Sequence, residues 1–421
     1  MPSALTLPLS ALFPHYTHLL LAYGASQPKS LPYLHPSFAL PALSLVHWYT
    51  GHPSSVNAPP PPLPSTKHLT LVGHGNVSLD IARLLLTNPS SLSSLDVPQC
   101  VVELMKASTI EHINIVSRRG PAQVAFTAKE LREMMNLPLA ALKPISSTLF
   151  DNLTSSNLTR QQTRILELMR KGSKVPFGTT GKTWSLEFFR TPISSQINRT
   201  GTKTITFDLN KLDDQGRAQP TGETEMQQTD LVVTSLGYHS DAFFPSTLSK
   251  RSSRREVAQE DQWHDPILGR VRTSTHGRVI DADGRHVHNV YASGWAANGA
   301  RGVLASTMHD AYDVADTMVE EYLANETSEV ANSGPEPVSA STPHFESRVH
   351  PLSSGKDLFR REGMQTAYPE WLEKAAREGG RKRVVTYRDW QLVNTEEVRR
   401  GKELGKERER MSWEEVDTFL A

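Results

Sequence analysis

The chain contains 421 residues, which is enough for two or three domains that each bury a hydrophobic core. Lysine plus arginine equals aspartate plus glutamate at 45 each, so no overall basic charge indicates a nucleic-acid-binding protein. The only cysteine, Cys100, excludes an internal disulfide and a cysteine-ligated iron–sulfur cluster, and we expect it to be an inert packing residue. No apolar run approaches the roughly 18 residues of a membrane-spanning helix.

The first 64 residues predict one short strand at 18–23, followed by loops rich in proline. No lysine or arginine precedes Lys29, so neither a signal peptide nor an arginine-rich transit peptide is predicted. The proline-rich segment 58–64 is typical of an extended polyproline II linker. A docking site for a proline-reading domain is the alternative interpretation.

A strand, a glycine turn and a helix are predicted between His68 and Leu86. Gly73 allows the tight turn, and Gly75 allows the backbone to approach a pyrophosphate. The helix that follows would direct its free N–H groups and its positive dipole end at the phosphates. Ser78 takes the third fingerprint position, where a small residue still permits close packing. An ordinary structural turn is the alternative.

A second strand, 113–116, ends in Arg118 and Arg119. An NAD site would place an acidic residue there to hold the ribose 2′-hydroxyl, whereas two planar cations suit the 2′-phosphate of NADP. Two charged hydrogen bonds predict roughly a hundredfold or greater preference for NADP. A solvated arginine turn is the alternative. Glu130, on a helix at 127–135, could bind a ribose hydroxyl or form a surface salt bridge.

Further helices and strands follow at spacings that indicate an α/β fold. A helix at 159–171 carries several cations, and strands are predicted at 184–190, 204–209 and 230–238. Residues 213–216 predict a hairpin turn. A strand at 290–293 leads into Gly294-Trp295 and a helix that begins near Gly302. Residues 326–341 have low complexity and are expected to be disordered.

Several of these motifs, in order along nearly the whole chain, resemble the adrenodoxin reductase family of mitochondrial-type ferredoxin–NADP⁺ reductases. The most specific is the long motif that begins Arg118-Arg119-Gly120-Pro121. The others are the segments 73–83, 184–192, 235–238, 293–295, 302–304, 389–390 and 401–408.

The resemblance implies a two-domain, Rossmann-like flavin and NADP reductase whose NADP domain is inserted in a split FAD domain. The expected parts are an N-terminal remnant of the FAD domain at 1–42, the NADP domain at 43–268 with its linker at 58–64, and the C-terminal part of the FAD domain at 269–421. A disordered insertion is expected near 326–345. The family's FAD fingerprint has no counterpart before Gly73, which implies an N-terminally incomplete chain, through a truncated gene model or splicing. A true loss of the fingerprint is the alternative.

The resemblance also implies ligands for both cofactors. For NADP(H) these are Gly73, His74, Gly75, Asn76, Val77, Arg118, Arg119, Glu130 and Gly302. For FAD they are Trp295, Gly302, Val303 and Leu304. Asp80 is similar to a family carboxylate near the flavin and is the catalytic candidate, with a polar residue on the helix as the alternative. No metal site is expected.

The implied activity is hydride transfer from NADPH to FAD, followed by transfer of single electrons to a two-iron ferredoxin. Four cations of the helix at 159–171 would form the dock for the acidic ferredoxin, with a solvated helix face as the alternative: Arg160, Arg164, Arg170 and Lys171. The family implies the matrix side of the inner mitochondrial membrane, and peripheral membrane association stays open. A rival interpretation is an NADP-binding module without flavin. A third is a flavin reductase subunit serving another acceptor, but such subunits usually carry cysteine clusters that this chain lacks.

Overall fold

The polypeptide forms two compact units in the computed structural model. The first contains Met1–Gln27 and Gly237–Thr386, and the second contains Pro28–Leu236 and Tyr387–Ala421. No helix among the described residues is long and apolar enough to cross a bilayer. The structure describes residues 9, 12, 16–31, 33–34, 38–52, 55, 58–151, 153, 158–199, 201–242, 262–302, 304–331, 374 and 384–421.

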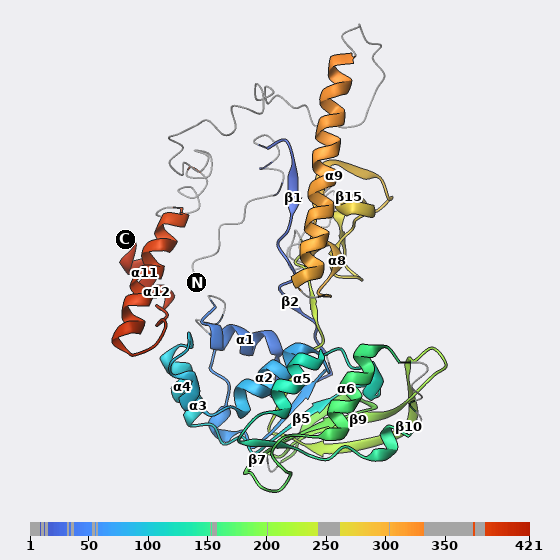
Figure 1. Ribbon diagram of the computed structural model, residues 1–421, viewed down its shortest axis with the longest axis vertical. Helices are drawn as coiled ribbons and strands as arrows, with labels where there is room; N and C mark the ends of the chain where they lie inside the picture. Colours follow the sequence, from blue (N-terminus) through green and yellow to red (C-terminus); the bar gives the residue numbers. More distant parts are fainter. Residues whose placement is uncertain are drawn as a thin grey trace. The chain divides into compact units, whose positions relative to one another are not determined.

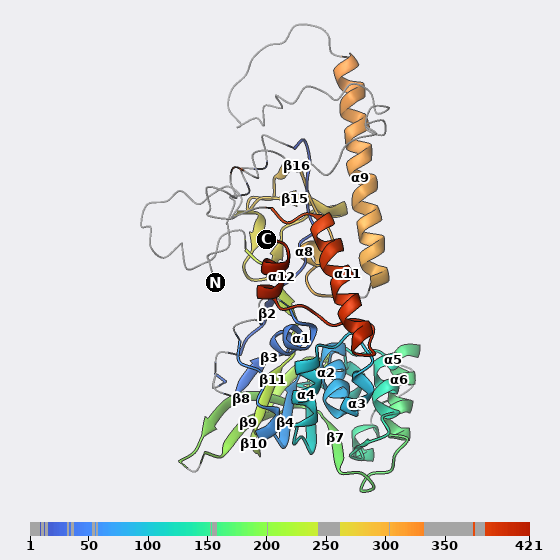
Figure 2. The same ribbon diagram turned by 90° about the vertical axis from the view of Figure 1, so that its left-hand side faces the viewer.

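A parallel sheet of six strands forms the centre of the second unit, in the order β3-β11-β4-β5-β7-β6 (Figures 1 and 2). Its central strands are continuous apolar runs, as expected of strands that are covered on both faces. Leu69, Leu71 and Ile113 are fully buried there. The strands are β3 (Ala39–Pro41), β4 (His68–Val72), β5 (His112–Val116), β6 (Ala140–Leu142), β7 (Lys182–Glu187) and β11 (Leu231–Thr234).

Amphipathic helices bury their apolar faces in the core of this unit. The helix predicted at 159–171 is confirmed, since Thr159 and Gln162 form a capping box at its start. α5 packs against both α2 and α6, as Figure 1 shows. The helices are α1 (Ala42–Thr50), α2 (Asn76–Leu86), α3 (Pro89–Leu92), α4 (Gln99–Lys106), α5 (Ala128–Met135) and α6 (Arg160–Lys171).

A three-stranded antiparallel sheet follows β7. It consists of β8 (Arg190–Ile197), β9 (Lys203–Leu212) and β10 (Ala218–Gln228). The predicted turn at 213–216 is confirmed, because the Asp213 carboxylate accepts hydrogen bonds from the backbone N–H groups of Gln215 and Arg217. The prediction of one strand through Arg190 was wrong. Phe189 adopts a positive φ of 57°, which ends β7 and turns the chain into β8.

The first unit contains a smaller mixed sheet, in which β16 pairs with β1 in parallel and with β15 antiparallel. Val279, Val290 and Ala292 of this sheet are buried in the unit's own core. The elements are β1 (Leu19–Leu21), β2 (Gln27–Pro28), β12 (Tyr238–His239), β13 (His264–Asp265), β14 (Arg270–Val271), β15 (Arg278–Ile280), β16 (His286–Ala292), α8 (Trp295–Asn298) and α9 (Leu304–Ala331).

The structure corrects three local predictions. The segment 58–64 is not a free linker, because Leu63 is fully buried in the core of the second unit and its carbonyl accepts a hydrogen bond from Thr109 N–H. α9 continues to Ala331, so residues 326–331 are helical; the rest of the expected insertion, to 345, lies outside the described residues. Cys100 is exposed at the start of α4 and is not a packing residue.

The C-terminal helices α11 (Tyr387–Glu403) and α12 (Trp413–Phe419) belong to the second unit and not to the one that holds residues 269–331. The turn between them is attached to the segment between α3 and α4 (Figure 2). The buried Lys406 ammonium donates to the Val97 carbonyl and to Glu409, 2.6 Å away. Arg410 holds both carboxylate oxygens of Asp96 at 2.7 and 3.0 Å. These contacts attach residues 387–421 to the second unit.

Candidate functional site

The glycine turn lies between β4 and α2 in the second unit. Gly73 has φ 126°, and a Cβ atom at this position would clash with the carbonyl oxygen of Ser235, the residue that follows β11. The Gly73 N–H donates to the Val116 carbonyl at the end of β5, 2.8 Å away. Gly73 is therefore required because two neighbouring strands end against the turn.

Gly75 has the opposite environment. A Cβ atom there would meet nothing within 4 Å, so the space beside Gly75, the residue before α2, is open among the described residues. The first N–H groups of the helix have no acceptor within it, and they face this space together with the positive end of the helix dipole. Ser78 is buried, and its hydroxyl donates to the Gly73 carbonyl at 2.5 Å, which fixes the turn against the helix. This geometry is suited to an anion such as a pyrophosphate.

The His74 side chain points into the protein. Only 6 % of the residue is exposed, and its ring packs between Phe126 and Phe188, with centroids 5.9 and 5.0 Å away. Nε2 lies 2.7 Å from the Ile115 carbonyl oxygen. Burial lowers the pKa of His74 from 6.5 to about 4, so the ring is neutral near pH 7. Any contact between His74 and a dinucleotide is therefore made by its main chain.

Hydrogen bonds connect the glycine turn to the segment after the arginine pair. The Ala125 N–H donates to the His74 carbonyl at 2.9 Å. The Thr127 N–H donates to Oδ1 of Asn76 at 2.8 Å, so the first residue of α2 also caps the start of α5. Val77, the next predicted ligand, is half-buried in the first turn of α2. The structure therefore brings together the two motifs that the sequence predicts as one site.

Arg118 and Arg119 follow the carboxyl end of β5. Arg118 is exposed and Arg119 is half-buried, and within the described parts of the chain neither guanidinium has a hydrogen-bond or ion-pair partner. Their main chain is held firmly: the Asn210 amide donates to the Arg118 carbonyl at 3.1 Å, and the Ser117 hydroxyl donates to the Arg119 carbonyl at 2.7 Å. Sequence reasoning missed Asn210, which comes from β9 and has no local signal.

The two carboxylates predicted near this site have partners inside it. Glu130 accepts a hydrogen bond from the Thr127 hydroxyl in the first turn of α5, and the structure describes no ion pair for it. Asp80 pairs with Arg83 at 3.0 Å, and Arg83 also pairs with Glu133 of α5. Burial raises the pKa of Asp80, and the nearby Arg83 partly offsets this rise. Asp80 therefore holds the arginine that connects α2 to α5, whereas the Glu130 bond lies within the first turn of α5.

The predicted flavin loop lies in the first unit, after β16. Gly294 has a φ of 65°, and Trp295, which is 36 % exposed, stacks on Tyr238 with ring centroids 6.2 Å apart. Asp310 of α9 holds the loop: its carboxylate accepts hydrogen bonds from Gly294 N–H at 2.6 Å, Ser293 Oγ at 2.8 Å and Asn298 Nδ2 at 2.8 Å. No sequence pattern predicts Asp310, apart from the presence of an acid one to two turns into the helix that follows.

The remaining flavin candidates follow this loop. Gly302 has a φ of 85°, a backbone conformation that favours glycine, and Leu304 is exposed at the first position of α9. Val303 lies outside the described residues. Gly302 belongs to the first compact unit, whereas the glycine turn at Gly73 belongs to the second.

The cationic candidates all lie on α6. Arg160, Arg164, Arg170 and Lys171 are exposed, and among the described residues none has an ion-pair partner. The Arg170 guanidinium lies over the Phe150 ring, 5.0 Å from its centroid. The helix therefore presents unneutralised positive charge to solvent.

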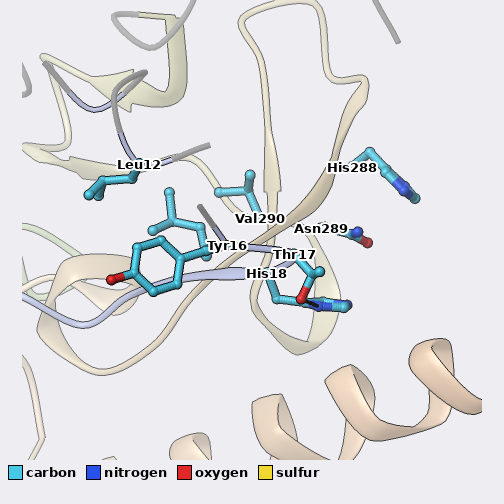
Figure 3. Close-up of a pocket in the computed structure, with 8 residues that line it drawn as sticks. Leu12, Tyr16, Thr17, His18, His288, Asn289 and Val290 are labelled. Atoms are coloured by element: carbon cyan, nitrogen blue, oxygen red, sulfur yellow. Dashed lines mark hydrogen bonds between the residues drawn. The ribbon is translucent and has the colours of Figure 1, made fainter. Parts of the chain in front are cut away.

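A pocket in the first unit contains none of the predicted site residues. It lies between the residues before β1 and the middle of β16, where Tyr16, Thr17 and His18 face Asn289 and Val290 (Figure 3). The His18 ring stacks on Tyr291 at 6.3 Å, and burial lowers its pKa.

Comparison with known proteins decides the family. No family model matches the chain. The chain is 30 % identical to the mitochondrial NADPH:adrenodoxin oxidoreductase of Homo sapiens, over 94 % of this chain and 72 % of that protein. The Drosophila melanogaster protein of the same name is also 30 % identical, over 96 % of this chain and 74 % of the relative. The chain belongs to the NADPH:adrenodoxin oxidoreductase family.

The solved structure of Mycobacterium tuberculosis FprA in complex with NADPH has the same fold. Its TM-score is 0.74 at 24 % identity, and the match covers 98 % of this chain and 80 % of that chain. Membership in the NADPH:adrenodoxin oxidoreductase family makes this chain an oxidoreductase, and the predicted α/β, two-domain reductase fold is confirmed.

The cofactors of the adrenodoxin oxidoreductase family are NADP(H) and FAD, and residues of this chain fit both to different extents. The open space at Gly75 and the unpaired guanidiniums of Arg118 and Arg119 fit a dinucleotide with a 2′-phosphate. The positive-φ glycines and the exposed Trp295 fit a flavin ring. For the FAD pyrophosphate, the sequence before Gly73 holds no second G-x-G-x-x-G fingerprint.

Proposed function

We propose that this chain takes electrons from NADPH through FAD and delivers them singly to a two-iron ferredoxin of the adrenodoxin type. The single observation that carries the proposal is the pair Arg118 and Arg119 at the end of β5, whose guanidiniums have no partner among the described residues. The segment that follows the pair is hydrogen-bonded to the glycine turn. The mitochondrial relatives support the same acceptor and a mitochondrial location.

In this proposal the second unit binds the dinucleotide. The main chain at Gly73–Val77 receives the pyrophosphate at the N-terminus of α2, and Arg118 and Arg119 receive the 2′-phosphate. Asn76 orients the start of α5 through Thr127. Glu130, in the first turn of α5, is the proposed acceptor for a ribose hydroxyl. No residue of this site has to transfer a proton, because the cofactors carry the chemistry.

The first unit would contact the flavin. FAD, when bound, accepts a hydride and releases its two electrons one at a time. Trp295, Gly302, Val303 and Leu304 are the proposed contacts, with Gly302 also toward the nicotinamide, and Asp310 holds the loop in shape. We also propose that the Asp80 carboxylate lies near the flavin.

The function is tested with the purified full chain. We expect flavin absorbance bands and NADPH-dependent reduction of an adrenodoxin-type ferredoxin, with little reduction by NADH. A colourless protein that still binds NADPH, and that reduces no ferredoxin when FAD is added, would overturn the proposal.

We also propose that the exposed cations of α6 dock the acidic ferredoxin. Reversing two charges, in Arg160→Glu/Arg164→Glu, is expected to raise the KM for ferredoxin about tenfold and to flatten its salt dependence. The matched control is Lys211→Glu, which reverses an exposed cation of β9 that has no ion-pair partner among the described residues. It should change KM by less than about twofold. A KM for the double variant equal to that of the control would exclude α6 as the dock.

A further inference from the structure

His74 is a buried titratable residue beside the proposed pyrophosphate site, and the proposed function leaves its side chain without a role. A carbonyl oxygen can only accept, so Nε2 carries the hydrogen and donates it to Ile115 O, 2.7 Å away. Gly73 N–H donates to the next carbonyl, that of Val116, at 2.8 Å. The turn therefore binds two consecutive carbonyls at the end of β5, and only Ser117 separates these from Arg118.

The His74 ring also contacts the elements that support the arginine pair from the other side. Its edge-on neighbour Phe188 precedes Phe189, whose N–H donates to the Arg119 carbonyl at 3.3 Å. Its second neighbour is Phe126. The residue before it, Ala125, donates its N–H to the His74 carbonyl. One side chain thus touches the glycine turn, the end of β5 and the segments on both sides of the arginines.

The second ring nitrogen of His74, Nδ1, is buried and makes no hydrogen bond to the described residues. Here a single donor reaches β5, and the rest of the ring serves to fill the space between two phenylalanines.

We propose that the His74 side chain is a positioning group that fixes the distance between the glycine turn and the arginine pair. It thereby sets the preference for a 2′-phosphorylated dinucleotide, although the imidazole ring itself does not contact the dinucleotide. This inference rests on the proposed NADPH site. A dinucleotide bound by its pyrophosphate at the turn reaches the arginines with its 2′-phosphate only if the two are held in register. NADH has no 2′-phosphate, so its affinity depends on the turn and not on this register.

The test compares dissociation constants for NADPH and NADH on the purified full chain. His74→Phe keeps a ring of similar size and removes the donor. We expect it to weaken NADPH binding about five- to tenfold and NADH binding less than about twofold. His74→Gln, whose amide can donate to the same carbonyl, is expected to restore most of the NADPH:NADH ratio.

His112→Phe is the matched control. His112 is a half-buried histidine at the opposite end of β5, bonded to Thr183 Oγ1 at 2.7 Å and Asn114 Oδ1 at 2.8 Å. Its loss should destabilise the same sheet but leave the NADPH:NADH ratio unchanged. If His74→Phe does not fold, His74→Asn, whose shorter amide falls short of β5, takes its place with the same expectation.

The outcomes are distinguishable. The inference would be overturned if His74→Phe and His112→Phe had the same NADPH:NADH ratio of dissociation constants. It would also be overturned if His74→Phe weakened the binding of NADPH and NADH equally. Either result would leave the proposed NADPH site unaffected. A wild-type chain that binds both coenzymes equally would overturn the proposed function and this inference together.

Discussion

At the scale of single residues, His74 shows how burial changes a side chain's chemistry. Burial lowers its pKa from 6.5 to about 4, whereas its hydrogen bond to Ile115 opposes the shift only in part. Between these two pH values the unfolded chain binds a proton that the folded chain does not. The contribution of His74 to the free energy of unfolding is therefore fully present above about pH 6.5, and it is lost as the pH falls toward 4.

We expect the free energy of unfolding to fall on acidification, with roughly 2–3 kcal/mol of the loss between pH 7 and 4.5 due to His74. Urea unfolding of the wild type and of His74→Gln at both pH values isolates this part. The other histidines of lowered pKa, such as His112 and His264, act in the same direction and remain in both proteins. If the free energy of unfolding falls by the same amount between pH 7 and 4.5 in the wild type and in His74→Gln, then His74 is not buried in its neutral form.

At the scale of elements, the loop between β16 and α9 depends on one carboxylate. Asp310 accepts hydrogen bonds from a backbone N–H, a hydroxyl and an amide, and all three donors belong to the loop that carries Trp295. Such bonds to a charged acceptor are among the stronger ones in proteins. The loop would lose its fixed shape without them.

Asp310→Ala is therefore expected to weaken FAD binding by the full chain roughly tenfold, measured by flavin fluorescence, and to reduce the near-ultraviolet circular dichroism of the Trp295–Tyr238 stack. Asp313→Ala, an exposed acid one turn further along α9, is the control. FAD affinities that match between the two variants would show that Asp310 does not shape this loop for flavin.

At the scale of the whole molecule, the C-terminal segment completes the second unit. The Lys406 side chain is 1 % exposed and pairs with Glu409 in the same turn. Lys406 also donates to the Val97 carbonyl, and Glu409 accepts from Gln99 N–H, so the pair attaches the C-terminal turn to the start of α4. Removing one partner of a buried pair leaves the other uncompensated.

Lys406→Ala is expected to lower the free energy of unfolding by about 3 kcal/mol, as measured by urea denaturation. Lys402→Ala, which removes an exposed lysine of α11, should change it by less than about 0.5 kcal/mol. A similar small change in both variants would mean that the C-terminal turn contributes little to the second unit.

The sequence predicted those parts of the fold and site that depend on short-range pattern. The turn at Gly73, the arginines after β5 and the helix at 159–171 each follow from neighbouring residues, and the structure has them where they were expected. The supporting residues could not be found in this way. Asn210 reaches Arg118 across 92 positions, and the C-terminal turn reaches Asp96 across 314. Long-range contacts of this kind leave no periodicity in the sequence.

The second unit's preference for NADPH is the central claim, and one measurement tests it most directly. The dissociation constants of the full chain for NADPH and NADH are compared at fixed ionic strength, for the wild type and for Arg118→Leu/Arg119→Leu. We predict that the wild type binds NADPH roughly a hundredfold more tightly than NADH, and that the ratio falls close to one in the double variant. Equal affinities in the wild type, or a ratio that survives the loss of both arginines, would contradict the account.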